Sequence, residues 1–330
     1  MSFDAKPRVC VYGAGAVGGH IATRLAQGDQ CELSVVARGE HLRAIRADGL
    51  HLRHVDGGSW QARPAHATDD AGELPAQDLV LVGLKAHALP AHAQALGRLL
   101  APDGVVVFLT NGIPWWWQHG LAQAEPLTLL DPDGALWRAL GPERVLGAVV
   151  YSSNEVEAPG RVLHRGKNRF ILGEPNGTLS PRLVRVVQLL QASGIHSEAS
   201  AQLRTEVWRK LLFNASGNPV SALTRLGTVE RVGDPALLGL CRQLVQEVAL
   251  VAAASGWPVH ADDLAQAGSA TPVASARPSM LQDVLLSRPL EVEAILGQPQ
   301  RFAREHGVDT PALDVVLALL RGLARAQTLS

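Results

Sequence analysis

A glycine-rich segment near the start of the chain lies between two apolar patterns of different period. An alternating apolar run at Val9–Tyr12 precedes it, and a helical apolar pattern that reaches Leu25 follows it. The segment itself reads Gly13-Ala14-Gly15-Ala16-Val17-Gly18. Glycines at this GxGxxG spacing permit a tight turn between a strand and a helix, and they let backbone N–H groups approach a pyrophosphate closely. The chain is therefore expected to begin with an α/β dinucleotide-binding domain in which these six residues contact the cofactor.

The first 200 residues continue this alternation of short apolar strands and helical stretches. Further strands are expected at Leu33–Ala37, Leu79–Leu84 and Val105–Leu109, which predicts a parallel, Rossmann-like sheet. Gly57-Gly58 and the segment around Leu50 predict a small inserted hairpin. The later segments are expected as antiparallel strands at one edge of the sheet: Val145–Tyr151, Arg161–His164 and Arg169–Leu172.

The pattern after Gln202 is helical, with no convincing strand. We expect two domains, residues 1–200 and residues 201–330, with a loop at the Ala- and Ser-rich segment Gly268–Ala276. The expected helical stretches are Glu206–Ala215, Pro235–Ala254, Glu291–Arg304 and Ala312–Ala326.

Composition excludes several classes of function. The net charge of -1 lacks the basic excess of a nucleic-acid surface. The longest uncharged stretch, Gly104–Ala124, contains too many polar and turn residues for a membrane span, and the first six residues lack the layout of a signal peptide, so a cytoplasmic protein is expected. The 3 cysteines have neither CxxC nor metal-ligand spacing, which predicts buried apolar side chains and no metal site.

The second predicted strand ends at Ala37-Arg38. An NAD-specific site would carry an acidic residue near this point to hold the ribose 2′-hydroxyl, whereas a guanidinium can grip a 2′-phosphate. Arg38 therefore favours NADP(H), although a solvated arginine is the alternative.

Lysine is scarce in this chain. Only 4 of the 30 basic residues are lysine, and two of them, Lys85 and Lys210, occupy informative positions. Lys85 follows the end of a core strand, where open α/β sheets bind ligands. Lys210 begins a series with Asn214 and Asn218, spaced four apart, that lines one face of a helix until Pro219 ends or kinks it. A lysine can lose its proton near neutral pH, as a general acid must, but by itself this series is better explained as a solvated face.

Three other polar segments have ordinary explanations. Ser279–Gln282 fits a capping box, Glu291 follows Pro289 and could complement a helix dipole, and Asn111-Gly112 after a strand is typical of a turn. Spacing alone assigns none of them to a site.

Taken together, the chain resembles the ketopantoate reductase family (2-dehydropantoate 2-reductases) over nearly its whole length. The resemblance rests on Gly13–Gly19, Val36–Gly39, Leu84–Ala86, Asn111-Gly112, Trp208–Leu211 running to Asn214 and Asn218-Pro219, Ser279–Asp283, and Glu291 within Pro289–Glu293. It implies an all-helical second domain like the C-terminal domain of 6-phosphogluconate dehydrogenase, and NADPH-dependent reduction of 2-dehydropantoate to (R)-pantoate on the way to pantothenate and coenzyme A.

The resemblance also implies a role for each matching residue. Lys210 would be the general acid, and Glu291 would bind the reacting substrate and orient Lys210. Asn111, Ser279, Asn214 and Asn218 would bind the substrate, a small 2-oxo acid. Arg38 would bind the 2′-phosphate of the cofactor, with Lys85, Asn111 and Glu291 as further cofactor contacts. A homodimer, and closure of the two domains across a cleft, are likewise implied.

One departure from the family is the run Trp115-Trp116-Trp117, where many relatives carry smaller residues. Three successive side chains on a helix cannot all enter one core, so at least one is expected at the mouth of a cleft or at a subunit interface, with ordinary packing as the alternative. A bulky wall near Asn111 would favour a reductase of a different 2-oxo acid. A non-catalytic NADP-binding sensor is the third alternative, although it would have no use for Lys210 and Glu291 together.

Overall fold

The computed structural model describes residues 6–269 and 277–329, and its contacts divide the chain into two units. Unit 1 comprises residues 1–110 and 115–203, and unit 2 comprises residues 111–114 and 204–330. The predicted loop at Gly268–Ala276 falls mostly outside the described residues. The short segment Asn111–Pro114 belongs to the helical unit although the chain on both sides of it belongs to unit 1.

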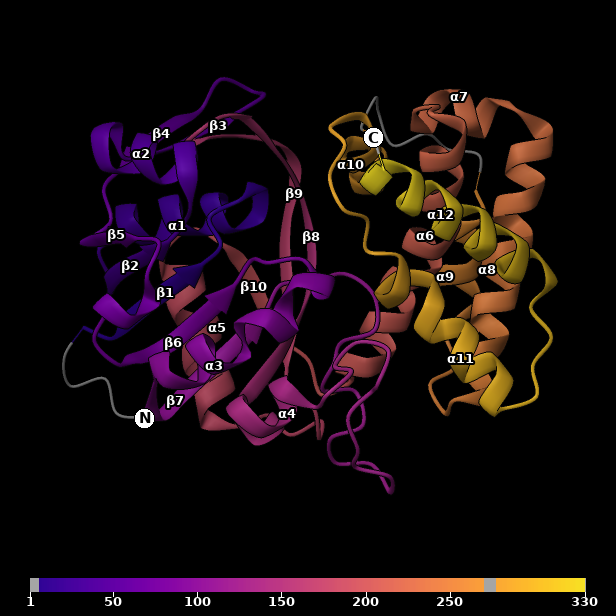
Figure 1. Cartoon of the computed structure of the whole chain (residues 1–330), viewed down its shortest axis with the longest axis horizontal. Helices are drawn as coiled ribbons and strands as arrows, with labels where there is room; N and C mark the ends of the chain where they lie inside the picture. Colours follow the sequence, from indigo (N-terminus) through magenta and orange to yellow (C-terminus); the bar gives the residue numbers. More distant parts are fainter. Residues whose placement is uncertain (1–5, 270–276, 330) are drawn as a thin grey trace. The chain divides into compact units, whose positions relative to one another are not determined.

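Unit 1 is built on a sheet of ten strands (Figure 1). The strands are β1 (Arg8–Tyr12), β2 (Glu32–Val36), β3 (Leu50–His54), β4 (Ser59–Ala62), β5 (His66–Thr68), β6 (Gln77–Val82), β7 (Leu100–Phe108), β8 (Val145–Ala158), β9 (Arg161–Gly173) and β10 (His196–Ala199). Their order is β4-β3-β9-β8-β7-β6-β1-β2-β5, and β10 pairs with β9. Strands β5, β2, β1, β6, β7 and β8 pair in parallel, which confirms the predicted parallel sheet.

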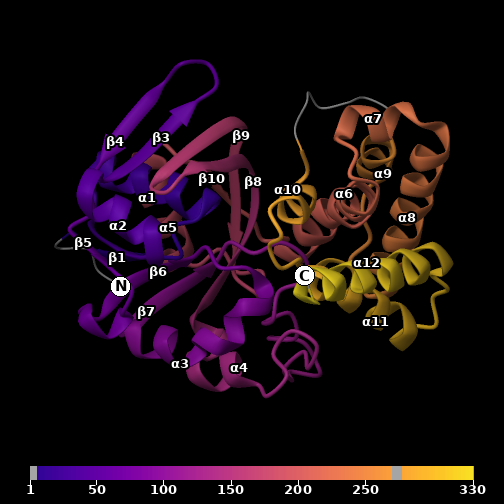
Figure 2. The same ribbon diagram turned by 45° about the horizontal axis from the view of Figure 1, so that its top comes forward.

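The antiparallel strands do not form the edge that the sequence analysis expected. Strands β8 and β9 pair antiparallel, but β9 then pairs in parallel with β3, so the hairpin β3–β4 forms that edge (Figure 2). The prediction missed the pairing of β9 with β3 because it took only the apolar segments of β8 and β9 as strands. The two strands are longer, with 14 and 13 residues, and the extra length of β9 gives β3 a partner. The inserted hairpin itself is confirmed.

Helices cover the sheet of unit 1. They are α1 (Ala16–Gly28), α2 (Gly39–Asp48), α3 (Leu89–Leu99), α4 (Ala135–Leu140) and α5 (Pro181–Ala192), with short 3-10 helices η1 (Ala71–Glu73), η2 (Ala86–Ala88) and η3 (Pro142–Arg144). Ile21 and Leu25 of α1 share one apolar core with Leu183 and Leu190 of α5 and with Val9 and its neighbours on the sheet. This burial of apolar surface supplies most of the stabilisation of the unit.

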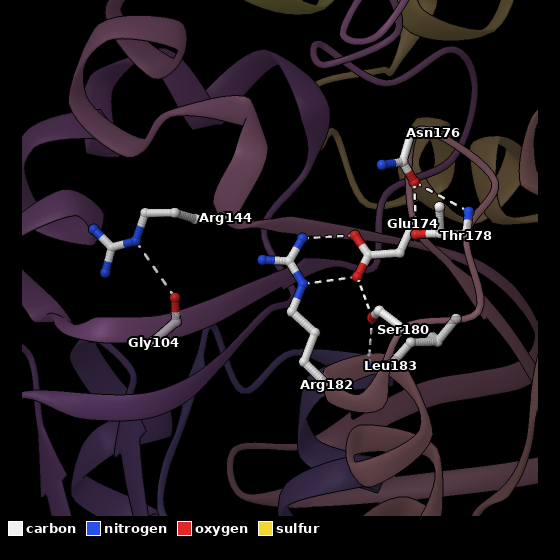
Figure 3. A network of polar contacts seen from close by, with 8 residues as sticks. All are labelled: Gly104, Arg144, Glu174, Asn176, Thr178, Ser180, Arg182 and Leu183. Atoms are coloured by element: carbon white, nitrogen blue, oxygen red, sulfur yellow. Dashed lines mark hydrogen bonds and ion pairs between the residues drawn. The ribbon is translucent and has the colours of Figure 1, made fainter. Parts of the chain in front are cut away.

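A buried carboxylate fixes the start of α5 (Figure 3). Glu174, only 3% exposed, accepts two hydrogen bonds from the guanidinium of Arg182, at 2.7 and 2.6 Å, and a third from the hydroxyl of Ser180. Ser180 also caps α5, because its oxygen accepts from the N–H of Leu183 at 3.2 Å. The buried charge is thus paired and hydrogen-bonded, which is the condition for a buried ion to be tolerated.

The regular secondary structure in the described residues of unit 2 is entirely helical. Its elements are α6 (Leu203–Thr224), α7 (Thr228–Gly233), α8 (Pro235–Ala254), α9 (Ala261–Ala267), α10 (Ser279–Leu285), the π-helix η4 (Glu293–Gly297), α11 (Gln298–Glu305) and α12 (Pro311–Leu329). The predicted α/β part followed by a helical part is therefore confirmed. Of the two alternatives predicted at Pro219, an end of the helix is wrong, because helix α6 continues through this proline to Thr224. A kink at Pro219 stays a prediction.

Helix α8 is the one candidate membrane span by length and composition among the described residues. In the structure it contacts α7, α9, α11 and α12, and it buries Leu244, Val248 and Val251 completely. Its apolar composition is thus explained in part by its place in the core of unit 2.

The three tryptophans are all buried, each no more than 2% exposed. They lie in a turn rather than on a helix, so the argument from helical spacing does not apply to them. The ring of Trp115 packs edge-on against Phe108 of β7 and Trp137 of α4, with centroids 5.5 and 6.3 Å away. Trp116 fills the space beside Gly147, where an added Cβ would lie 2.3 Å from the indole. The expectation that one tryptophan lies at a cleft mouth or a subunit interface is wrong, and ordinary packing explains the run.

Candidate functional site

The glycine-rich turn adopts the geometry that its sequence predicts. Gly13 has φ +94°, and an added Cβ would lie 2.9 Å from the side chain of Leu84. At Gly18 an added Cβ would lie 2.0 Å from the carbonyl oxygen of Gly13, so only glycine lets α1 pack this closely on the turn. Gly15, the N-cap residue of α1, has open space where its Cβ would be. The turn therefore offers an open backbone cradle at a helix N-terminus, which suits a pyrophosphate.

A pocket of about 180 Å³ lies beside this turn. Strands β1, β2 and β6 are parallel neighbours, so the residues that follow them meet at one edge of the sheet. The lining residues are Tyr12, Gly13, Ala14, Gly15, Val36, Ala37, Arg38, His41, Asp69, Leu84 and His92. The pocket thus combines an apolar floor with a few polar groups, as cofactor sites do.

The predicted cofactor residues divide into two groups. Gly13, Ala14, Gly15 and Arg38 line the pocket, and Arg38 is exposed at the N-cap position of α2. Ala16, Val17 and Gly18 belong to the first turn of α1 and do not line the pocket. Lys85 is half-buried next to the lining residue Leu84, at the N-cap position of η2.

The sequence analysis missed several polar residues of the pocket. Asp69 follows the short strand β5, and His92 of α3 hydrogen-bonds the hydroxyl of Tyr12 at 2.9 Å. His41 of α2 contacts the glycine turn directly. These residues lie far from the glycine motif in the sequence and have no pattern of their own, so only the fold reveals them.

A second cluster lies within unit 2 and contains Lys210, Asn111 and Glu291. The Nζ of Lys210 on α6 donates a hydrogen bond to Oδ1 of Asn111 at 2.6 Å. The Nδ2 of Asn111 donates to Oε2 of Glu291 at 3.5 Å. Since an ammonium only donates and a carboxylate only accepts, the carboxamide of Asn111 is held in one orientation between them.

The electrostatics of Lys210 follow from this setting. Its side chain is half-buried, and desolvation lowers the pKa of Lys210 to about 8 from its ordinary value of 10.5, while the negative charge of Glu291 acts in the opposite direction. The ammonium can therefore give up a proton near neutral pH and is still mostly protonated there. A group with this pKa is suited to general acid catalysis.

The segment that carries Asn111 is anchored by an unusual helix turn. Ala294 lies in the π-helix η4, and its carbonyl oxygen accepts a hydrogen bond from the N–H of Ile113 at 2.8 Å. Pro299, five residues after Ala294, has no N–H and cannot donate to this carbonyl in the π register, which leaves it available. Gly112, with φ +81°, packs against the same residue, and an added Cβ would lie 2.3 Å from the Ala294 oxygen. The π-helix thus brings Asn111 to Glu291.

The other predicted substrate residues are not tied to this cluster by hydrogen bonds within the described part of the chain. Asn214 and Asn218 follow Lys210 on α6 at one-turn intervals. The side chain of Asn214 is half-buried, and Asn218 is 7% exposed. Ser279 is exposed at the first residue of α10.

The expected capping box at Ser279 is wrong. Pro278 occupies the N-cap position, and Gln282 donates its side-chain N–H to the carbonyl of Arg277 at 2.9 Å. The chain is already helical at Ser279, so its hydroxyl does not act as the cap.

The three cysteines are buried and unbridged, as the sequence analysis expected. Among the described residues, no group of three or more His, Cys, Asp or Glu side chains could hold a metal ion.

Comparison with known proteins decides the family. Residues 9–177 match the family model "Ketopantoate reductase PanE/ApbA", and residues 202–324 match "Ketopantoate reductase PanE/ApbA C terminal". The chain belongs to the ketopantoate reductase family. The resemblance drawn from the sequence is thereby confirmed, and the chain is a member of a family of dinucleotide-dependent oxidoreductases.

Individual relatives cover nearly the whole chain. It is 38% identical to a 2-dehydropantoate 2-reductase of Mesorhizobium japonicum over 96% of this chain and 98% of the relative. A structure assigned as a ketopantoate reductase, from Ralstonia solanacearum MolK2, has a TM-score of 0.90 and 35% identity over 98% of this chain and 99% of the other. A D-mandelate dehydrogenase with NADH and anilino(oxo)acetate has a TM-score of 0.83 over 97% and 99% of the two chains, and at 21% identity it shows the fold alone.

Proposed function

We propose that this protein reduces the ketone of 2-dehydropantoate to (R)-pantoate with NADPH, and that Lys210 provides the proton. The observation that carries the proposal is the cluster in unit 2, in which Lys210, with its pKa lowered to about 8, is bonded to Asn111 and lies in the field of Glu291. A solvated face, the ordinary explanation of the Lys210 series, would give neither the burial nor the bond. Membership of the family supports the choice of substrate.

The residues of unit 1 fit a dinucleotide. The open space at Gly15 and the close packing at Gly18 leave a cradle that any side chain at either position would alter. Arg38 lines the same pocket and would hold the 2′-phosphate, which favours NADPH over NADH. When bound, the reduced nicotinamide supplies a hydride to the ketone carbon of the substrate.

The residues of unit 2 would then handle the proton. As the ketone carbon gains the hydride, its oxygen gains negative charge, and an N–H bond of Lys210 breaks as an O–H bond forms on that oxygen. Lys210 is left as a neutral amine, which solvent protonates again before the next turnover. Glu291 favours the ammonium before transfer, and Asn111 keeps Nζ in place.

We assign binding of the rest of the substrate to other polar groups of unit 2. Asn214 and Asn218 lie on successive turns of the same helix, Ser279 is accessible at the start of α10, and Asn111 has its amide within reach of Lys210. Further contacts of Lys85, Asn111 and Glu291 with the cofactor are part of the same proposal. It assigns most of the cofactor contacts to residues 1–200 and the proton donor to residues 201–330. The homodimer and the cytoplasmic location also stay predictions.

A reductase of a different 2-oxo acid is the second candidate. The fold shared with a D-mandelate dehydrogenase is the observation in its favour. The tryptophan run does not support it, because all three side chains are buried and Trp115 packs against Phe108 and Trp137 of unit 1. A non-catalytic sensor would have no use for a half-buried lysine that interacts with both Asn111 and Glu291.

The test is NADPH oxidation, followed by absorbance, with 2-dehydropantoate beside a panel of 2-oxo acids that includes phenylglyoxylate. We expect turnover of 2-dehydropantoate to exceed the others by at least about 100-fold in kcat/KM, since the site's polar groups would be left unpaired by other acids. Greater activity with another 2-oxo acid would show that this acid, and not 2-dehydropantoate, is the substrate. Binding of NADPH without turnover of any acid would favour the non-catalytic sensor.

The cofactor is tested separately with Arg38→Ala. Loss of a charge-assisted contact to the 2′-phosphate should raise the Kd of NADPH about 10-fold or more and leave that of NADH nearly unchanged. Arg43→Ala, an exposed arginine on the same helix, is the matched control. An equal rise in the Kd of NADPH and of NADH would show that Arg38 does not bind the 2′-phosphate.

A further inference from the structure

His41 connects the glycine turn to a second turn of unit 1. Its Nε2 donates a hydrogen bond to the carbonyl oxygen of Ala14, and its Nδ1 accepts from the N–H of Gly160 at 3.1 Å. A backbone N–H can only donate, so Nδ1 carries no proton and Nε2 must carry one. The imidazole is therefore neutral and in a single tautomer.

The bond to Ala14 has a consequence for the cofactor cradle. The carbonyl of Ala14 and the N–H of Gly15 belong to one planar trans peptide, so they point in opposite directions. Fixing the carbonyl on the imidazole therefore fixes the direction of the Gly15 N–H. Gly15 is the open N-cap position of α1, where the backbone would meet a pyrophosphate.

The other end of the link is also fixed. The carbonyl oxygen of Gly160 accepts from the N–H of His51 on β3 at 2.9 Å. Gly160 has φ +73°, and an added Cβ would lie 3.2 Å from the Cβ of Ala44. Because this turn is tied to the sheet, it gives the imidazole of His41 a firm support rather than a mobile one.

We propose that His41 is a positioning residue for the dinucleotide. It directs the N–H of Gly15 towards the pyrophosphate while its ring is held between Ala14 and Gly160. Because Nδ1 must accept from Gly160, the ring is held there only as the neutral imidazole, which makes cofactor affinity depend on the protonation of His41. The proposal rests on the dinucleotide function proposed above. It assigns a role to a residue outside the glycine motif, in a different helix and 26 residues after Gly15.

The direction of the pH dependence follows from the hydrogen bonds. Burial lowers the pKa of His41 below its ordinary value of 6.5, and the bond to Ala14 opposes this shift. Protonation would place an N–H on Nδ1 against the N–H of Gly160 and break that bond. Affinity is thus kept at pH 6.5 and above, and it is lost at lower pH, as the pH falls through the lowered pKa of His41. The titratable and charged groups that line the same pocket as His41 are Tyr12, Arg38, Asp69 and His92. Glu40 precedes His41 on α2, and Glu157 of β8 and Arg161 of β9 flank the turn that holds Gly160.

The experiment measures the Kd of NADPH by fluorescence at pH 7.5, 6.5 and 5.5. It compares the wild-type protein with His41→Leu, which has no polar group, and with His41→Gln, whose amide can donate and accept but does not titrate. His66→Gln, at an exposed histidine of β5 outside the pocket, is the control. At pH 7.5 we expect His41→Leu to raise Kd about 10-fold and His41→Gln to restore most of the affinity, as loss and recovery of one anchoring hydrogen bond predict.

The pH series gives the decisive comparison. The 2′-phosphate of NADPH titrates near pH 6, but it does so equally in every variant. We therefore expect the ratio of the wild-type Kd to the His41→Gln Kd to rise below pH 6.5, and the ratio to His66→Gln to stay constant.

Parallel pH curves for wild type and His41→Gln, or a folded His41→Leu protein with wild-type affinity, would overturn the proposal. Should His41→Leu fail to fold, the wild-type to His41→Gln ratio decides alone. A wild-type protein that binds neither NADPH nor NADH would instead refute the proposed function.

Discussion

The pH dependence of turnover offers a quantitative test of the role of Lys210. A general acid must be protonated to act, and the pKa of Lys210 is lowered to about 8 by burial. The rate should thus be near its maximum at pH 6.5, fall to about half at pH 8 and to about one tenth at pH 9, because each pH unit above the pKa removes tenfold more of the acid. An exposed lysine would still be almost fully protonated at pH 9.

The partner of Lys210 provides the second half of the test. The charge of Glu291 raises the pKa of Lys210, so Glu291→Gln should move the alkaline fall in rate to lower pH. Glu293→Gln is the matched control, because Glu293 lies two residues further on and pairs with Arg321 at 2.7 Å. The assay is kcat and kcat/KM for NADPH oxidation from pH 6 to pH 10.

Two results would refute this reasoning. One is a rate that stays constant to pH 10, which would mean that Lys210 is not the proton donor. The other is an alkaline limb that Glu291→Gln leaves in place or moves to higher pH, which would mean that the carboxylate does not act on the ammonium.

Three further perturbations follow from the packing. Gly112→Ala should lower kcat about 100-fold and destabilise the protein by about 1 to 3 kcal/mol. The new Cβ would lie 2.3 Å from the Ala294 oxygen, and residue 112 has a φ of +81°. An unchanged kcat would contradict this prediction. Lys210→Met should abolish turnover yet raise the free energy of unfolding at pH 7 by about 1 to 2 kcal/mol. The reason is that a fall in the pKa of Lys210 from 10.5 to about 8 costs the folded protein about 3 kcal/mol, and the lost hydrogen bond offsets part of the gain on removing the charge. A decrease in the free energy of unfolding, measured by urea denaturation, would contradict burial as the cause of the lowered pKa. Burial lowers the pKa of His20 to about 3, so His20 stays neutral in the folded protein and gains a proton in the unfolded chain below pH 6.5. The free energy of unfolding should therefore fall by about 2 kcal/mol between pH 6.5 and pH 5. His20→Leu should remove that part of the pH dependence.

The sequence predicted the parts of the molecule whose geometry is local. The glycine turn needs a positive φ at Gly13 and close approach at Gly18, and both requirements leave a mark on residue type. The strands and helices likewise follow from apolar periodicity. The family resemblance then linked Lys210, Asn111 and Glu291, which spacing alone could not do, because 99 and 180 residues separate the hydrogen-bonded pairs.

What the sequence could not predict depends on contacts between distant segments. The residues around Asn111 do not show that this segment joins the helical unit. The segment is anchored there by a hydrogen bond to the carbonyl of Ala294, which lies far away in the sequence, in a π-helix. His41 looks like any histidine on a polar helix until the fold places Ala14 and Gly160 on either side of it. The tryptophan run misled because a helix was assumed where the chain makes a turn.

The central claim is that Lys210 transfers the proton during reduction of 2-dehydropantoate. Its most direct test is a single turnover of enzyme-bound NADPH with 2-dehydropantoate, in which the wild-type protein is compared with Lys210→Ala and with Lys167→Ala, an exposed lysine on β9. Loss of the general acid should slow the oxidation of bound NADPH about 100-fold or more without weakening NADPH binding, and Lys167→Ala should match the wild type. Equal rates for Lys210→Ala and the wild type would contradict the account.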